Sequence, residues 1–273
     1  MTRALHFLPI ALGLSLAALQ VGCACKQTDS GTTQCETKAG LVGTTITQAV
    51  DWTPGTAIRV TVKGGSTRLG STAGTSVAVK AGTTNQLIAR FTPLNTTTDE
   101  TKQAKTDEMS RLTPTITPSA GLIDIAVAPP SGSSADLTAR VDLELPVGFD
   151  GAFTATTATG DLDIRGVSRS VSANSGLGKI VCVLAGAPAA TDTGSFITGQ
   201  GDIFFEVPAA SPIVIDAASG SDGAVLTTDL PAGWAADAGN TDQHKVLRGP
   251  GSSQNWNFNS SQFFTANVNI TFR

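Results

Sequence analysis

The sequence predicts an all-β protein, a single-stranded β-helix or β-solenoid-like repeat domain with one short helical excursion. Four stretches of its second half share one layout, in which a small residue and a glycine at a tight turn precede a short strand-forming run. They are TATGDLDIRG, ANSGLGKIVCVL, ITGQGDIFFEV and AASGSDGAVLTT. Their turn glycines, Gly160, Gly178, Gly201 and Gly223, recur about every 20 residues, as in stacked repeat proteins.

Two further observations support this class. The composition has 29 glycines, no tyrosine and 15% charged residues, which suits many short strands and turns. Several segments also alternate apolar and polar residues, as half-buried strands do. A β-sandwich is the alternative, but its hairpin signals are scarce, with Asp150-Gly151 and Asp222-Gly223 as the candidates. Like residues at like turn positions favour the solenoid, with a dry, aliphatic interior.

Residues 1–22 are predicted to be a secretion signal. Arg3 supplies the positive start, and an apolar run follows over residues 4–21. A retained membrane helix is the alternative, because the run is long enough to span a bilayer. The Gly22-Cys23 junction resembles that of bacterial lipoproteins, although Gln20 stands where their motif prefers an aliphatic residue. The resemblance implies lipidation of Cys23, and ordinary signal-peptidase cleavage is the competing outcome.

The same resemblance implies a location. Ala24 stands where an aspartate would favour retention in the inner membrane, so we expect an exported outer membrane lipoprotein, periplasmic or surface-facing. Its lipid anchor would provide the contact with the membrane. In such an oxidising compartment Cys25 and Cys35 could form a disulfide. Cys182 alternates with Ile180 and Leu184, which predicts a buried thiol.

The remaining chain is predicted to be a polar tether, residues 23–44, followed by one domain, residues 45–273. A helix is expected near 98–111, with Thr98 as its N-cap, and residues 231–256 are predicted to be a long loop. Strands are expected at 57–63, 76–81, 86–91, 122–127 and 136–146, the repeats fill 150–230, and an alternating strand, FFTANVNITFR, ends the chain.

The order of these motifs resembles a known family. The strand pair, the helix, the segment VDLELPVGFDGAFTATTATGDLDIRGV (141–167) and the repeat ITGQGDIFFEV (197–207) are similar to the bacterial putative-adhesin domain family, a β-helical domain of unknown function. The resemblance covers roughly residues 57–230 and implies a β-helical fold; the family name implies adhesion. Lys179 and Ala224 stand where the repeat usually carries aspartate, so a ligand role shared by all repeats is not implied.

A few residues are candidates for binding. Asp161, Asp163, Asp202 and Asp222 lie at or beside the turns and could bind calcium through their oxygens. Their alternative role is turn chemistry, in which aspartate accepts backbone N–H groups, and the regular spacing of calcium-binding β-rolls is missing. Trp234 lies in a polar stretch and is the candidate for contact with a ligand such as a sugar, whereas packing is the alternative.

Enzyme chemistry finds little support, and no catalytic residue, metal or cofactor is expected. His244 is the only histidine after the signal and has no nucleophile motif beside it. Histidines and cysteines lack the spacing of a zinc site. The net charge of −4 without a basic stripe excludes a typical nucleic-acid binder.

These observations lead to three hypotheses. The first is a non-catalytic envelope lipoprotein, an adhesin or structural scaffold that contacts a protein or glycan partner through a repetitive β surface. The second is a periplasmic subunit of an envelope protein complex, docking through a strand edge or the 231–256 segment. The third is a polysaccharide-acting β-helix enzyme, whose paired carboxylates could come from distant parts of the sequence.

Overall fold

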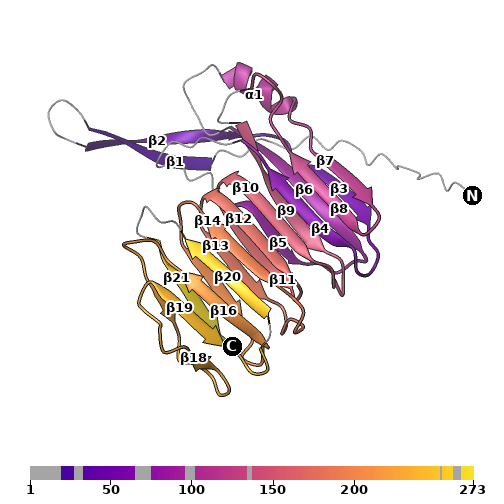
Figure 1. The fold of residues 1–273 in the computed structure, drawn as a ribbon. Helices are drawn as coiled ribbons and strands as arrows, with labels where there is room; N and C mark the ends of the chain where they lie inside the picture. The colour runs from indigo at the N-terminus through magenta and orange to yellow at the C-terminus, as the bar shows by residue number, and fades with distance from the viewer. Residues whose placement is uncertain are drawn as a thin grey trace, which may run out of the picture.

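A computed structural model describes residues 20–27, 33–64, 75–95, 102–133, 137–252, 254–260 and 266–273. Within these residues the protein consists of two large β-sheets and one short helix (Figure 1). The predicted all-β class is therefore confirmed. Most of the expected signal, residues 1–19, and the expected N-cap Thr98 lie outside the described residues. No helix in the described part of the chain is long and apolar enough to cross a membrane.

The first sheet has ten strands. Their order is β18 (Ala235–Ala236), β19 (His244–Arg248), β16 (Ile213–Ala218), β20 (Gln254–Ser260), β14 (Gly194–Thr198), β12 (Val171–Leu177), β10 (Phe153–Thr159), β4 (Ala57–Val62), β8 (Leu122–Val127) and β7 (Thr115–Ser119). The seven strands from β16 to β8 are parallel to their neighbours, and β7, β18 and β19 pair antiparallel at the two ends.

The second sheet has eleven strands. Their order is β1 (Gln20–Gln27), β2 (Thr33–Val42), β6 (Gln86–Asn95), β9 (Leu137–Leu145), β5 (Thr75–Ala81), β11 (Asp161–Val167), β13 (Ile180–Leu184), β15 (Ile203–Val207), β21 (Val268–Phe272) and β17 (Val225–Thr227), and β3 (Ile46–Asp51) also pairs with β6. From β9 to β17 the pairing is parallel, whereas β1, β2, β3 and β6 pair antiparallel.

The parallel parts of the two sheets form a stack of layers. Each layer contributes one strand to each sheet, and the layers follow the same order in both: β8/β9, β4/β5, β10/β11, β12/β13, β14/β15, β20/β21 and β16/β17. A solenoid predicts this parallel stacking. The antiparallel strands at the ends and the two open, mixed sheets that share one core are also compatible with a sandwich-like description.

The spatial order of the layers differs from their order in the sequence. The β4/β5 layer lies between β8/β9 and β10/β11, and the C-terminal β20/β21 layer lies between β14/β15 and β16/β17. The fourth repeat therefore does not stack on the third, because the last strand of the chain separates them. In that inserted layer, Ala266 takes the position next to the turn glycines: a Cβ on Gly223 would lie 1.9 Å from the Ala266 carbonyl oxygen.

Three expectations about segments can now be compared with the structure. The predicted helix is present as α1 (Lys102–Ser110), and Met109 is buried in the shared core. In the predicted polar tether at 23–44, β1 and β2 pair as a hairpin whose backbone hydrogen bonds tolerate polar residues, and residues 28–32 lie outside the described residues. The prediction of a long loop at 231–256 is wrong in part, because β18 and β19 pair there and β20 begins at Gln254.

The core between the sheets is more aromatic than expected. Phe196 of the ten-stranded sheet and Phe205 of the eleven-stranded sheet contact across it, with ring centroids 5.4 Å apart. Phe258 stacks on Phe196 at 4.6 Å. Trp256 is fully buried beside them, and Gly194 faces its indole so closely that a Cβ there would lie 2.1 Å from a ring carbon. The predicted dry, aliphatic interior therefore fits the other layers better than it fits this end of the stack.

Candidate functional site

A ladder of buried hydroxyl groups fixes the turns between the two sheets. Thr157, Ser175, Thr198 and Ser260 occupy equivalent positions on β10, β12, β14 and β20. Each hydroxyl donates to a backbone carbonyl at or directly before a turn, at 2.6–3.1 Å. Ser175 and Thr198 donate to the turn of the preceding layer. Such groups satisfy buried carbonyls that would otherwise lack partners, so these hydroxyls have a structural role that the repeat pattern did not reveal.

The repeated glycines are required by close backbone contact. A Cβ on Gly178 would lie 2.3 Å from the Gly160 carbonyl oxygen, and one on Gly201 would lie 2.5 Å from the Gly178 oxygen. The φ angles of these glycines are also positive, 151° at Gly178 and 139° at Gly201. The turn glycines thus stack on one another and leave no room for a side chain or a ligand between the layers.

The four aspartates proposed for calcium are not gathered in one place. Asp161 accepts the backbone N–H of Lys179 at 2.9 Å, and Asp202 accepts that of Asn267 at 2.7 Å, in each case in the next layer. Asp163 instead pairs with Arg165 on the outer surface. Among the described residues, no group of three or more histidine, cysteine or carboxylate side chains could hold a metal. Asp161 and Asp202 thus perform turn chemistry between layers.

Trp234 is packed against the protein instead of being presented to solvent. Only 8% of the residue is exposed, its indole N–H donates to the Ala209 carbonyl at 2.6 Å, and its ring meets Phe272 edge to face at 4.6 Å. The ring therefore offers little surface to a ligand. Burial against Phe272 could not be inferred from the polar residues around Trp234 in the sequence.

The cysteines lie in two regions. In the hairpin, the register places Cys25 opposite Cys35 and Cys23 opposite Thr37. Directly opposed positions of an antiparallel pair have Cα separations that suit a disulfide, and the Cys25–Cys35 bridge stays a prediction. Cys182 is fully buried, and burial raises the pKa of its thiol well above the ordinary value, which makes it unreactive.

His244 lies on a strand and not in a loop. It begins β19, and its Nε2 is 2.8 Å from an Asp216 carboxylate oxygen. The Asp216 carboxylate lies on β16, which pairs with β19. The pair is an exposed side-chain contact between two neighbouring strands, and the Thr241 hydroxyl accepts the backbone N–H of His244 at 3.0 Å.

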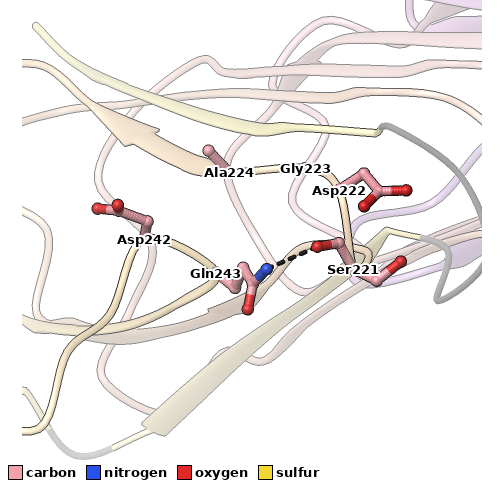
Figure 2. A pocket seen from close by; sticks show the side chains of 6 residues that line it. All are labelled: Ser221, Asp222, Gly223, Ala224, Asp242 and Gln243. Carbon is pink, nitrogen blue, oxygen red and sulfur yellow. Dashed lines mark hydrogen bonds between the residues drawn. The ribbon is translucent and has the colours of Figure 1, made fainter.

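A polar depression of about 540 Å³ opens beside the last layer (Figure 2). Its lining residues are Ser221, Asp222, Gly223, Ala224, Asp242 and Gln243. The Gln243 amide donates to the Ser221 carbonyl at 2.6 Å, and the Asp242 carbonyl accepts the Val225 N–H. The carboxyl groups of Asp222 and Asp242 point away from each other in Figure 2. The depression is thus held by one side-chain and one backbone hydrogen bond, and it does not present the converging carboxylates of a sugar-cleaving site.

The outer surface of the ten-stranded sheet carries an uncharged polar array that the sequence analysis missed. Strands β10, β12, β14 and β20 contain no charged residue. Their outward side chains line up across the register. We call this set the neutral face: Thr154, Thr156, Ser172, Asn174, Ser195, Ile197, Asn257 and Asn259. In the sequence, the only sign of this face was the alternation within each strand. The pairing register of the strands is needed to show that these side chains adjoin.

The polar groups of the neutral face have no partners among the residues the structure describes. Within the described part of the chain, no side-chain hydrogen bond or ion pair involves them. Parallel strands place neighbours about 4.8 Å apart across the sheet, and alternate residues about 6.6 Å apart along a strand. The face therefore presents free hydroxyl and amide groups at two regular spacings.

The outer surface of the eleven-stranded sheet differs, because it carries ion pairs. Glu144 contacts both Lys80 and Arg90 at 2.9 Å, and these cations hold the pKa of Glu144 below its ordinary value, Arg90 contributing most. Asp163 pairs with Arg165 at 2.8 Å. We call this set the charged face: Lys80, Arg90, Arg140, Asp142, Glu144, Asp163, Arg165, Glu206 and Arg273.

Comparisons with known proteins extend the description of the fold. No protein-family model matches the chain, and no curated protein sequence matches it. Among solved structures, the chain is similar to a "putative cell adhesion protein" from Clostridium sporogenes, with a TM-score of 0.56 and 11% sequence identity. The match covers 84% of this chain and 100% of that chain. At this identity the likeness concerns the fold alone.

Proposed function

We propose that the chain is a non-catalytic protein of the cell envelope that adheres through the neutral face of a β-solenoid. The observation that carries this proposal is the array of unpartnered hydroxyl and amide groups over four adjacent strands. Free hydrogen-bonding groups on a rigid sheet suit binding, since they need no rearrangement before contact.

The solenoid description is supported by the pairing of the strands. Seven layers are parallel in both sheets, and three of the turn glycines stack on one another in adjacent layers. The antiparallel strands then cap the two ends of the stack. β-Repeat proteins need such caps, because the end layers would otherwise expose unpaired strand edges. Pro118 in the edge strand β7 is consistent with such a cover, because proline cannot extend a sheet.

The envelope location is supported by the apolar N-terminal run and the Gly22-Cys23 junction. The name of the structural neighbour, a putative cell adhesion protein, points to the same setting. We propose that Cys23 is lipidated and that the protein is an outer membrane lipoprotein. Growth with a labelled fatty acid tests this: label should enter the wild-type protein and be lost in Cys23→Ser, and equal labelling of both would contradict it.

Adhesion is tested with intact cells. Surface digestion by a protease should remove the folded domain, and deletion of the gene should lower attachment of the cells to surfaces and to other cells. Re-expression of the wild-type chain should restore attachment. Unchanged attachment after deletion, together with failure of the purified domain to bind cells, matrix or glycans, would contradict the proposal.

A role as a subunit of an envelope complex is the second candidate. The β1–β2 hairpin projects from the stack in Figure 1 and joins β6 through two residue pairs, Leu41 with Asn95 and Val42 with Leu94. Strand β1 also forms one edge of the sheet, and strand edges pair readily with a partner chain. Crosslinking in cells distinguishes the two candidates, because a single stoichiometric partner would favour the subunit.

A further inference from the structure

We propose that the neutral face binds a neutral polysaccharide lying across strands β10, β12, β14 and β20. This inference rests on the proposed adhesive function and names its ligand. Its basis is the set of eight outward side chains defined above, which face solvent from one continuous part of the sheet.

The chemistry of the face matches that of a polyhydroxylated chain. Serine and threonine hydroxyls and asparagine amides each donate and accept hydrogen bonds, and so do sugar hydroxyls. Because Thr156, Asn174 and Asn259 have no partners in the described chain, a ligand does not have to break internal hydrogen bonds. Ile197 is 45% exposed among them and could contact the apolar face of a sugar ring.

The distribution of charge favours a neutral ligand. Charged side chains occur only at the margins of the face. Arg59 contacts Asp124 at 2.7 Å and His244 contacts Asp216 at 2.8 Å, whereas Lys63, directly after β4, is exposed without an ion pair among the described residues. Anionic polymers, including nucleic acids, require unpaired cations to neutralise their groups. The neutral face has none, so a chain without charge is the complementary ligand.

The repetition of the face favours a polymer over a single sugar. Thr154, Ser172, Ser195 and Asn257 form one row across the strands, and a second row runs from Thr156 to Asn259. Each hydrogen bond of an exposed group contributes little, but linked contacts on one chain add through their high effective concentration. The buried side chains of Phe196, Trp256 and Phe258 hold the strands from behind, which keeps the rows in register.

Sedimentation with insoluble polysaccharides tests the inference. The purified full-length chain is mixed with microcrystalline cellulose, with chitin and, as an anionic comparison, with calcium alginate beads. We expect retention on at least one neutral polymer and little on alginate. Asn174→Lys, at the centre of the face, should weaken retention about tenfold or more, because the ammonium group would lose water without gaining a partner.

Thr271→Lys is the matched control, since Thr271 is also exposed on a strand but belongs to the outer surface of the other sheet. It should retain wild-type binding, and both variants should unfold at the wild-type temperature. Ser172→Ala with Asn174→Ala supplies a second, milder variant that adds no charge and should also weaken retention.

Four outcomes would overturn the inference: no retention on either neutral polymer, equal retention of Asn174→Lys, preference for alginate, or capture on polycrystalline ice instead of polysaccharide. These outcomes are distinct from failure of adhesion. If cells still attach through the domain while the purified chain ignores both neutral polymers, the adhesive function stands and the polysaccharide ligand is wrong.

Discussion

The neutral and charged faces are built on the same stacked layers, yet they use their polar groups differently. On the charged face, Glu144 is satisfied by Lys80 and Arg90, and Asp163 by Arg165. On the neutral face, groups such as Ser172 and Asn174 have no partner in the described chain. Exposed ion pairs contribute about 0–1 kcal/mol each, so neither face is a major source of stability. The difference lies in availability, because the hydrogen-bonding groups of the neutral face have no partners within the described chain.

A second contrast occurs within single strands. Ser172 and Ser175 both lie on β12, but Ser172 points outward whereas Ser175 is buried and donates to the Gly160 carbonyl at 3.0 Å. Successive side chains of a strand point to opposite faces. The position in the strand therefore decides that the Ser175 hydroxyl is structural and that the Ser172 hydroxyl is a candidate ligand contact.

The largest expected effect concerns the core behind the neutral face. Trp256→Ala should lower the free energy of unfolding by about 3–5 kcal/mol, because a fully buried indole is removed and a cavity remains. Denaturant unfolding measures this loss. Trp52→Ala, at a partly buried ring, should cost clearly less. Similar losses in the two variants would show that the aromatic cluster does not support the neutral face specifically.

The next effect concerns the turns that join the two faces. Gly178→Ala should destabilise the protein by about 3 kcal/mol, since its Cβ would meet a backbone oxygen at 2.3 Å in addition to the strain of a positive φ. Gly148→Ala is the control: its φ is 71° and its Cβ would meet nothing within 4 Å. Its cost should be about 1–2 kcal/mol. Thermal or denaturant unfolding measures the loss of stability in both variants. Equal losses would contradict the close stacking of the turn glycines.

A smaller effect separates inward from outward hydroxyls. Ser175→Ala should cost about 1–2 kcal/mol, because the buried Gly160 carbonyl loses its donor. Ser172→Ala on the same strand should change the free energy of unfolding by less than about 0.5 kcal/mol. Its effect is expected in binding to polysaccharide instead. An equal loss of stability in both variants would contradict the assignment of the two hydroxyls.

The smallest effect concerns the charged face and depends on pH. The pKa of Glu144 is lowered in the folded protein, mainly by Arg90 and then by Lys80. Its contribution is therefore fully present above the pKa of a carboxyl in the unfolded chain, about 4.3, and is lost as the pH falls through the lower folded-state pKa. Glu144→Gln should cost roughly 0.5 kcal/mol at pH 7, since the pair is exposed.

Unfolding measured from pH 7 to pH 3 checks this dependence, and the difference between Glu144→Gln and wild type should shrink towards low pH. Asn174→Gln, on the neutral face, supplies the comparison. Neither asparagine nor glutamine titrates, so the effect of this substitution on stability should not vary between pH 7 and pH 3. A constant difference for Glu144→Gln would mean that the ion pairs do not act in solution.

Several parts of the fold could be predicted because they depend on local pattern. The segment AIRVTV alternates, and β4 places Ile58, Val60 and Val62 in the core. Alternation gave β8 at the predicted bounds, 122–127. The hairpin over 20–42 was not predicted, because its residues are polar and its strands are defined by pairing with each other and with β6. The packing of Trp234 could not be predicted for a similar reason, since its partner Phe272 is distant in sequence.

The sequence by itself determined the all-β class, the positions of most central strands and the turns at which only glycine fits. These features follow from side-chain alternation and backbone sterics, which act over a few residues. Only the tertiary structure decided which layers adjoin, including the insertion of β20/β21 between β14/β15 and β16/β17. The neutral face depends on that choice, because Asn257 and Asn259 come beside Ser195 and Ile197 only through long-range backbone pairing. Strand neighbours are selected by hydrogen bonds between distant segments, and no local pattern encodes them.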